Sequence, residues 1–276
     1  MTDISEWQGG VGRNWATEWA RTDRSFAGLT PHLLATIAGE PGGRIVDVGC
    51  GAGEVALAVA AARPQAQVTG VDVSPDLVAA ARERGGTVGN ARFLLADATL
   101  WADPHGAPDL YVSRHGVMFF PDPPVAFGHL AKVAAPGARF VFSCFRAAAE
   151  NVWAVEIAKL LPPPAPAAGQ DFPPGPFAFA DPEHVKRCMA GWRDFAFTPV
   201  DYEYIAGAGS NPVADALEFF AKIGPTAFAI RTLPASAKAS FMAKLEALVR
   251  SRLVGGKVTF AAAAWLVTAT VDHQSG

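Results

Sequence analysis

Cysteine is scarce in this chain, and its spacing argues against two kinds of site. Only three cysteines occur among 276 residues, at Cys50, Cys144 and Cys188. They are odd in number, far apart and without a C-x-x-C pair, so neither a disulfide framework nor a zinc site is expected. We therefore expect no bound metal, and the reducing cytoplasm is the simplest location for such a chain.

Clusters of positive charge and long apolar runs are also missing. The formal net charge is -3, and no run of Lys and Arg suggests the basic surface that binds nucleic-acid phosphates. No stretch reaches the roughly 18 uninterrupted apolar residues of a membrane-spanning helix. The first residues also lack the basic and apolar regions of a secretory signal. We expect a monomer or homodimer that binds neither nucleic acid nor membrane.

What the chain does contain is enough apolar sequence for a core, arranged as alternating strands and helices. Half of the residues are hydrophobic and 18% are charged, which is typical of a globular protein. Between residues 42 and 145, short apolar runs alternate with helical patterns, and this alternation predicts a parallel sheet covered on both faces. The expected strands are Arg44–Val48, Gln67–Val71, Arg92–Ala96, Leu110–Ser113 and Arg139–Phe145.

The segments around this block are expected to cover a ligand pocket. Residues 11–38 predict two helices that form a flap, so residues 1–146 would comprise the flap and a cofactor-binding core. Residues 147–276 would contribute cap insertions, at about 147–178 and 207–257, and the last helix and strands of the same core. Gly255-Gly256 would stop the last helix, and Phe260–Val271 would be the final strand. The cap residues expected as pocket walls are Phe172, Phe177, Phe179, Trp192, Phe219 and Phe220.

The sharpest motif is VDVGCGAGE at residues 46–54. Three glycines at alternate positions follow a strand and precede a helix, so the backbone can turn tightly and approach a ligand at the helix N-terminus. In nicotinamide-binding loops the third glycine comes three residues after the second, but here Glu54 occupies that position. Asp47 would repel a pyrophosphate, so the loop favours a cofactor that carries positive charge and no phosphate.

Two further acids follow the next two expected strands. Asp72 ends the second strand and Asp97 follows the third. Since ligands of open α/β sheets bind outside the carboxyl ends of the strands, both acids and Asp47 are expected at one edge. Each acid alone could be a helix or turn cap, but together they favour a site for a cationic nucleoside.

These motifs, together with SRHGVMFFPDP at residues 113–123, resemble the class I S-adenosylmethionine-dependent methyltransferases. The resemblance is to a bacterial small-molecule branch related to the ubiquinone and menaquinone pathway enzymes, and it covers residues 11–146 best. It implies a doubly wound, mostly parallel α/β sheet of seven strands, the last antiparallel, with a helical cap. It also implies an enzyme that transfers a methyl group from S-adenosylmethionine to an oxygen, nitrogen or carbon atom of a small molecule, leaving S-adenosylhomocysteine.

The resemblance implies a role for each motif. The glycines would shape the pocket for the methionine end of the cofactor, the acid at residue 72 would hold the ribose, and the acid at residue 97 would hold the adenine. Residues 73 and 98 would lie beside the adenine ring. The cofactor-binding residues expected are Asp47, Gly49, Cys50, Gly51, Gly53, Asp72, Val73, Asp97, Ala98, Arg114 and Trp15.

Two residues near the expected transfer site, His115 and Trp15, keep more than one interpretation. His115 departs from the usual motif, and it is either a general base or a histidine that packs or orients the substrate. Arg114 is expected to act mainly through its backbone. Trp15 either closes over the cofactor or docks the N-terminal helix on the core.

Two other classes of function stay open at this point. A nicotinamide-dependent oxidoreductase could use a similar sheet, although the glycine spacing argues against it. A protein could also bind S-adenosylmethionine without catalysis.

Overall fold

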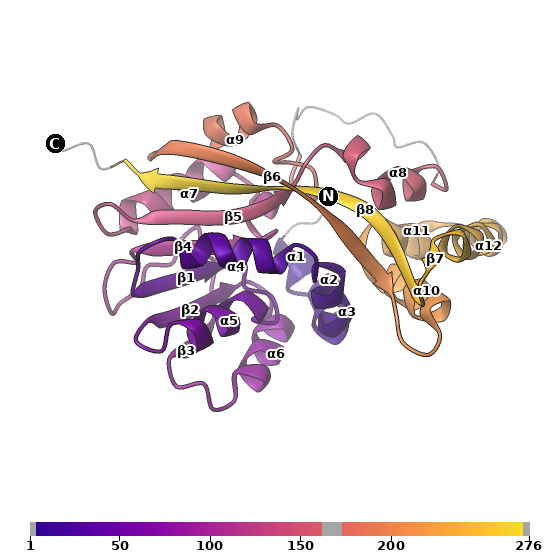
Figure 1. The fold of residues 1–276 in the computed structure, drawn as a ribbon, viewed down its shortest axis with the longest axis horizontal. Helices are drawn as coiled ribbons and strands as arrows, with labels where there is room; N and C mark the ends of the chain where they lie inside the picture. The colour runs from indigo at the N-terminus through magenta and orange to yellow at the C-terminus, as the bar shows by residue number, and fades with distance from the viewer. Residues whose placement is uncertain (1–3, 162–172, 273–276) are drawn as a thin grey trace.

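The computed structural model describes residues 4–161 and 173–272, which form an α/β fold around one sheet (Figure 1). The strand order is β3-β2-β1-β4-β5-β8-β6, and β7 pairs with β8 off this path. The strands are β1 Arg44–Val48, β2 Gln67–Asp72, β3 Ala91–Leu95, β4 Leu110–Arg114, β5 Arg139–Phe145, β6 Trp192–Gly207, β7 Leu253–Val254 and β8 Lys257–Val271.

Strand direction confirms the fold class expected from the sequence. Strands β1 to β5 pair in parallel, whereas β8 runs antiparallel to both β5 and β6. In β1 every residue after Arg44 is buried, as expected for a central strand that is covered on both faces. The carboxyl ends of the parallel strands therefore meet at one edge, where open α/β sheets bind ligands.

Helices follow the strands of the core at the positions that the capping signals predict. Ser74 Oγ accepts a hydrogen bond from Leu77 N at the start of α6, and Asp122 does the same for Val125 N at the start of α7. Both helices have proline in the first turn, where its missing N–H costs nothing. The helices of this region are α5 Glu54–Ala62, α6 Pro75–Gly85, η1 Val117–Phe119, α7 Pro123–Val133, η2 Ala148–Glu150, α8 Val152–Ala158 and α9 Pro182–Cys188.

The prediction of two helices within residues 11–38 is wrong, because three helices cover this segment, and a fourth precedes it. The break between the second and third falls at Glu18 (φ −98°, ψ 16°), so Trp15 and Trp19 lie on different helices. Glu18 is buried there, and its carboxylate pairs with the neighbouring Arg21 and with Lys222. The contact with Lys222 is long-range, and no local pattern reveals it. The four helices are α1 Ile4–Trp7, α2 Gly10–Thr17, α3 Trp19–Ser25 and α4 Thr30–Ala38.

The segment at residues 207–257, which was expected to be an insertion and is called the C-terminal insertion below, also departs from the expectation at two places. Helix α11 Gly224–Thr232 was not predicted, and it lies between α10 Pro212–Lys222 and α12 Ala235–Ser251. Gly255 and Gly256 do not stop a helix. With φ values of 55° and 78°, they form the tight turn between β7 and β8 that two consecutive left-handed residues favour.

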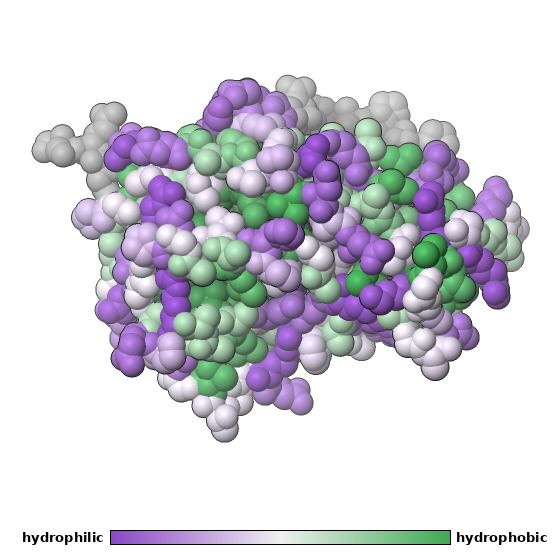
Figure 2. All heavy atoms as spheres, in the orientation of Figure 1, coloured by the Kyte–Doolittle hydropathy of each residue, from purple (hydrophilic) through white to green (hydrophobic). Residues whose placement is uncertain are grey.

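The core is aromatic and the surface is mixed. The largest fully buried side chains include Tyr111, Phe127, Phe140, Phe142 and Phe179. Hydrophilic and hydrophobic residues are interspersed over the face in Figure 2. Within residues 4–161 and 173–272, no helix combines the length and apolar character needed to cross a membrane.

The N-terminal helices are fixed to the C-terminal insertion by ion pairs. In Figure 1, α2 and α3 lie between the parallel strands and α10 to α12. Arg21 contacts Asp215 and Glu218 of α10 at 2.7 and 2.5 Å, and Lys222 contacts Glu18 at 2.5 Å. These pairs join segments that are about 200 residues apart in the sequence.

Replacing Lys222 with methionine should lower the free energy of unfolding by about 1–2 kcal/mol, because the buried Glu18 carboxylate loses one of its two charged partners. Chemical denaturation measures this change. Lys186→Met is the matched control, since Lys186 pairs with Glu183 on one exposed helix and should change stability by less than about 0.5 kcal/mol. Equal losses of stability in the two variants would show that the contact with Glu18 contributes no more to the free energy of unfolding than an exposed ion pair does.

Candidate active site

A cavity lies at the carboxyl ends of the parallel strands, and residues from the strand ends, the N-terminal helices and the C-terminal insertion line it. All the site residues expected from the sequence contribute to its wall except Gly53. Those that do are Trp15, Asp47, Gly49, Cys50, Gly51, Asp72, Val73, Asp97, Ala98, Arg114 and His115.

The three glycines of the loop serve different purposes. Their φ values are 65°, 54° and 87° for Gly49, Gly51 and Gly53, a region that strains other residues. A Cβ on Gly51 would meet no atom within 4 Å, because this residue faces open space. A Cβ on Gly53 would lie 2.9 Å from the Phe93 ring. Gly53 therefore starts helix α5 and packs against the core instead of forming the cavity wall.

Asp72 ties the glycine loop to the start of the next helix. Its Oδ2 accepts a hydrogen bond from Gly51 N and its Oδ1 accepts one from Ser74 N, both at 2.9 Å. Each carboxylate oxygen can accept a second hydrogen bond, so the same side chain can still receive hydroxyl donors from the cavity. Asp97 is half-buried, and its Oδ1 accepts from Thr99 N at 2.8 Å.

Asp47 presents a buried carboxylate that is only half satisfied. Its Oδ2 accepts from Ala56 N at 3.0 Å, whereas its Oδ1 is buried without a hydrogen-bond partner among the residues that the structure describes. Burial raises the pKa of Asp47 to about 7, with the Asp72 charge adding to this effect and the Arg114 charge opposing it. Unpaired buried polar atoms are rare in native proteins, so this oxygen fits a site that receives a positively charged ligand.

The Arg114 side chain joins the cavity wall, which goes beyond the backbone role that the sequence suggested. Its guanidinium pairs with Glu54, with Asp23 at 2.9 Å and with the Thr30 hydroxyl at 3.0 Å. The other Asp23 oxygen pairs with Arg84 at 2.9 Å. Sequence reasoning missed Asp23, because nothing around it in the chain predicts that it bridges two arginines.

His115 is held as a neutral ring in an unusual backbone conformation. Its φ is 59°, its Nδ1 lies 2.9 Å from Ser143 Oγ, and its Nε2 is buried without a partner. Burial, helped by the Arg114 charge, lowers the pKa of His115 well below its usual value. When Nδ1 donates to Ser143, Nε2 carries the free lone pair and can accept a proton.

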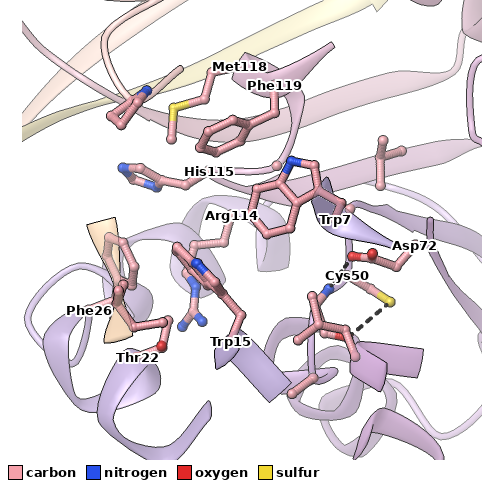
Figure 3. A pocket seen from close by; sticks show the side chains of 18 of the residues that line it. Trp7, Trp15, Thr22, Phe26, Cys50, Asp72, Arg114, His115, Met118 and Phe119 are labelled. Atoms are coloured by element: carbon pink, nitrogen blue, oxygen red, sulfur yellow. Dashed lines mark hydrogen bonds between the residues drawn. The ribbon is translucent and has the colours of Figure 1, made fainter. Parts of the chain in front are cut away.

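Tryptophans of the N-terminal helices stand across the cavity. Figure 3 shows Trp7 and Trp15 between His115 and Phe26 on one side and Asp72 and Cys50 on the other. The ring centroids of Trp7 and Trp15 are 5.6 Å apart. Trp7 was not expected at the site, because it lies outside the segment that the resemblance covers.

The expected aromatic walls are only partly present. Phe219 and Phe220 line the cavity. Phe179 is fully buried among core phenylalanines, and Trp192 packs against Tyr111 and Phe140, so the prediction for these two residues is wrong. Phe177 does not line the cavity either, and it stacks on Trp153 at 5.8 Å, while Phe172 lies outside the described residues. Unexpected aromatic residues that line the cavity include Phe26, Phe145, Trp153 and Tyr204.

The sequence of this region matches a family model. A model described as a methyltransferase domain matches residues 19–189, which is more than half of the chain. The chain belongs to this family of methyltransferase domains. The match includes the glycine loop, both following acids and His115, and it confirms the recognition made from the motifs.

Curated relatives match a shorter stretch of the chain than the family model does. A trans-aconitate 2-methyltransferase of Variovorax paradoxus is 37% identical over 105 residues, which are 38% of this chain and 39% of the relative. A demethylmenaquinone methyltransferase of Thermus thermophilus is 39% identical over 99 residues, or 36% of this chain and 45% of the relative. The chain thus spans about two fifths of the length of these relatives.

Solved structures share the fold over a longer stretch. Phosphoethanolamine N-methyltransferase 2 of Haemonchus contortus, in complex with phosphomonomethylethanolamine and S-adenosylhomocysteine, has a TM-score of 0.53 at 17% identity. The match covers 99% of this chain and 61% of that one. The YcgJ protein of Bacillus subtilis has a TM-score of 0.51 at 17% identity. The match covers 88% of this chain and 98% of that one. At this identity the likeness shows the Rossmann-like fold alone.

Proposed function

We propose that this chain transfers the methyl group of S-adenosylmethionine to an oxygen, nitrogen or carbon atom of a small molecule. The observation that carries the proposal is the set of Asp47, Asp72 and Asp97 around one cavity, beside a glycine loop that is open at Gly51. This arrangement suits a nucleoside that carries positive charge and no phosphate. The family supports the reaction type.

The residues present fit such a cofactor. Asp72 would accept the ribose hydroxyls, Asp97 would receive the adenine amino group, and the unpaired Asp47 oxygen would face the cationic methionine end. When bound, the cofactor supplies a methyl carbon whose bond to sulfur breaks with the electron pair left on sulfur. His115 Nε2 would accept the proton that a hydroxyl or amine acceptor loses.

The remaining segments of the chain would cover this site. We propose that residues 1–146 supply the flap and the cofactor core, and that the insertions at 147–178 and 207–257 supply a cap. We also propose a cytoplasmic monomer or homodimer that does not act on nucleic acid, in keeping with its net charge of -3 and three free cysteines.

Release of S-adenosylhomocysteine from S-adenosylmethionine, measured against a library of small acceptors, tests this function. The library should include trans-aconitate and demethylmenaquinone, since the relatives are named for both. Acceptor-dependent release supports a methyltransferase. Tight cofactor binding without release against any acceptor would instead indicate a protein that binds the cofactor without catalysis.

The affinity for S-adenosylmethionine should rise between pH 6 and pH 8. Because the Asp47 carboxyl has its pKa raised to about 7, it is largely protonated at pH 6, and a bound cation favours its charged form. Binding below pH 7 should therefore release a proton. For each unit by which the bound ligand lowers that pKa, the affinity at high pH should exceed the affinity at low pH by up to about tenfold. Calorimetry in two buffers of different ionisation enthalpy measures the proton.

Asp47→Asn is the control for this pH dependence, since the amide keeps the shape of the side chain and does not titrate. Its affinity should be weaker and nearly constant over this pH range. A variant that keeps the full pH dependence would assign the released proton to another group.

A further inference from the structure

The cavity changes character along the sheet. At the ends of β1, β2 and β3 its wall carries the acidic side chains, whereas beyond them it is mostly aromatic. The aromatic residues come from the end of α3, the ends of β4 and β5, helix α8, strand β6 and helix α10. We call this part the acceptor chamber, and it consists of Phe26, His115, Phe145, Trp153, Tyr204 and Phe219.

The rings of the acceptor chamber form a continuous set of contacts. The centroid of His115 lies 4.2 Å from that of Phe145 and 4.8 Å from that of Phe26. Trp153 lies 5.4 Å from Phe145 and stacks on Tyr204 at 5.6 Å. Such walls present flat apolar faces and ring edges, which pack best against another flat ring.

The charges around the cavity disfavour an anionic acceptor. Among the described residues, its wall holds five carboxylates, from Asp23, Asp47, Glu54, Asp72 and Asp97, and one guanidinium. That guanidinium, on Arg114, is already paired with two of these carboxylates. A carboxylate placed in the acceptor chamber would therefore be buried without a free cationic side chain to pair with, at a high cost in free energy.

The polar atoms of the acceptor chamber suit a neutral oxygen. Within residues 4–161 and 173–272, His115 Nε2 and Trp153 Nε1 are both buried without a hydrogen-bond partner. The indole nitrogen can only donate, whereas the neutral imidazole nitrogen can accept. A hydroxylated ring could satisfy both kinds of group with oxygen atoms, and leaving either group unpaired costs about 1–3 kcal/mol.

We propose that the acceptor is an uncharged aromatic molecule that presents a hydroxyl group to His115, and that the acceptor chamber rejects carboxylates. The inference rests on the proposed methyl transfer and adds the substrate class to it. An aliphatic ammonium is disfavoured too, because it can donate to His115 Nε2 but has no lone pair to accept from the Trp153 N–H, which would stay unpaired.

Three probes of equal ring size test this substrate class. They are 2-naphthol, 2-naphthoate and 2-naphthylmethylammonium, each titrated at pH 7.5 into protein saturated with S-adenosylhomocysteine. The expected result is that 2-naphthol binds at least about tenfold more tightly than either charged probe. Equal or tighter binding of the carboxylate or the ammonium would overturn the proposal.

Variants of Trp153 test whether the probe binds in the acceptor chamber. Trp153→Leu should weaken 2-naphthol binding at least about tenfold, and Trp153→Phe, which keeps a ring and loses the N–H, should weaken it less. Trp265→Leu is the control, since Trp265 pairs with Phe197 away from the cavity and should leave the affinity unchanged. Unchanged affinity in both Trp153 variants would show that the probe binds elsewhere and would overturn the proposal.

The titration with S-adenosylhomocysteine alone separates this proposal from the function beneath it. If the protein binds S-adenosylhomocysteine but prefers a charged probe, the substrate class is wrong and the methyl-transfer proposal stands. If S-adenosylhomocysteine does not bind, the proposed function is wrong and the substrate class falls with it.

Discussion

Replacing Asp72 with alanine should weaken the binding of S-adenosylhomocysteine by about 100-fold or more. The carboxylate is placed to accept the two ribose hydroxyls, and hydrogen bonds to a charged group contribute about 1.5–3 kcal/mol each. The variant also removes the acceptor of Gly51 N and Ser74 N, which loosens the glycine loop. Calorimetric titration measures the affinity, and chemical denaturation measures the accompanying loss of stability.

Asp109→Ala is the matched control for this variant. Asp109 also accepts backbone N–H groups, from Gly43 and Arg44, but it precedes β4 at the opposite end of the sheet. It should lower stability in a similar way and leave the affinity for S-adenosylhomocysteine within about twofold. An Asp72 variant that binds as tightly as the wild type would remove Asp72 from the site.

Replacing His115 with asparagine should lower kcat by about 100-fold or more, once an acceptor is in hand, and should leave S-adenosylhomocysteine affinity nearly unchanged. Asparagine tolerates the left-handed conformation at this position but cannot accept the acceptor proton. General base catalysis typically contributes at least this much. Steady-state kinetics at saturating substrates measure the change.

The pH profile separates proton transfer from simple packing. Because burial keeps the pKa of His115 well below its usual value, the ring stays neutral and the wild-type rate should not fall between pH 8 and pH 6.5 through protonation of this group. His129→Asn, at a half-buried histidine that contacts Trp101 O outside the cavity, should keep full activity. A kcat for His115→Asn within about threefold of the wild type would show that positioning provides the rate without this base.

The lowered pKa of His115 also makes the stability of the protein depend on pH. Below pH 6.5 this residue is protonated in the unfolded chain, whereas in the folded chain it stays neutral. Its contribution to stability is therefore complete above pH 6.5 and is lost as the pH falls further.

The cofactor end of the site could be predicted from the sequence because its physics is local. A strand, a glycine turn and a helix lie next to one another in the chain, and parallel strands bring Asp47, Asp72 and Asp97 to one edge. The same locality made the positions of β1 to β5 predictable to within about one residue. Gly53 was misplaced because its left-handed conformation serves the helix start and the fit against Phe93.

Apart from His115 and Phe219, the acceptor end could not be predicted, because its residues meet only through tertiary contacts. Phe26, Trp153 and Tyr204 come from three distant segments, and none has a motif around it. Glu18, where α2 ends, pairs with Lys222, more than 200 residues away. Phe179 and Trp192 were expected to line the cavity, but tertiary packing buries them in the core instead.

A crystal structure with S-adenosylhomocysteine tests the central claim most directly. The account predicts that the ribose hydroxyls lie within hydrogen-bond distance of Asp72, that the adenine lies beside Asp97 and Ala98, and that the sulfur points toward His115 and the acceptor chamber. A nucleoside bound elsewhere, or one in this cavity that touches neither Asp72 nor Asp97, would contradict the account.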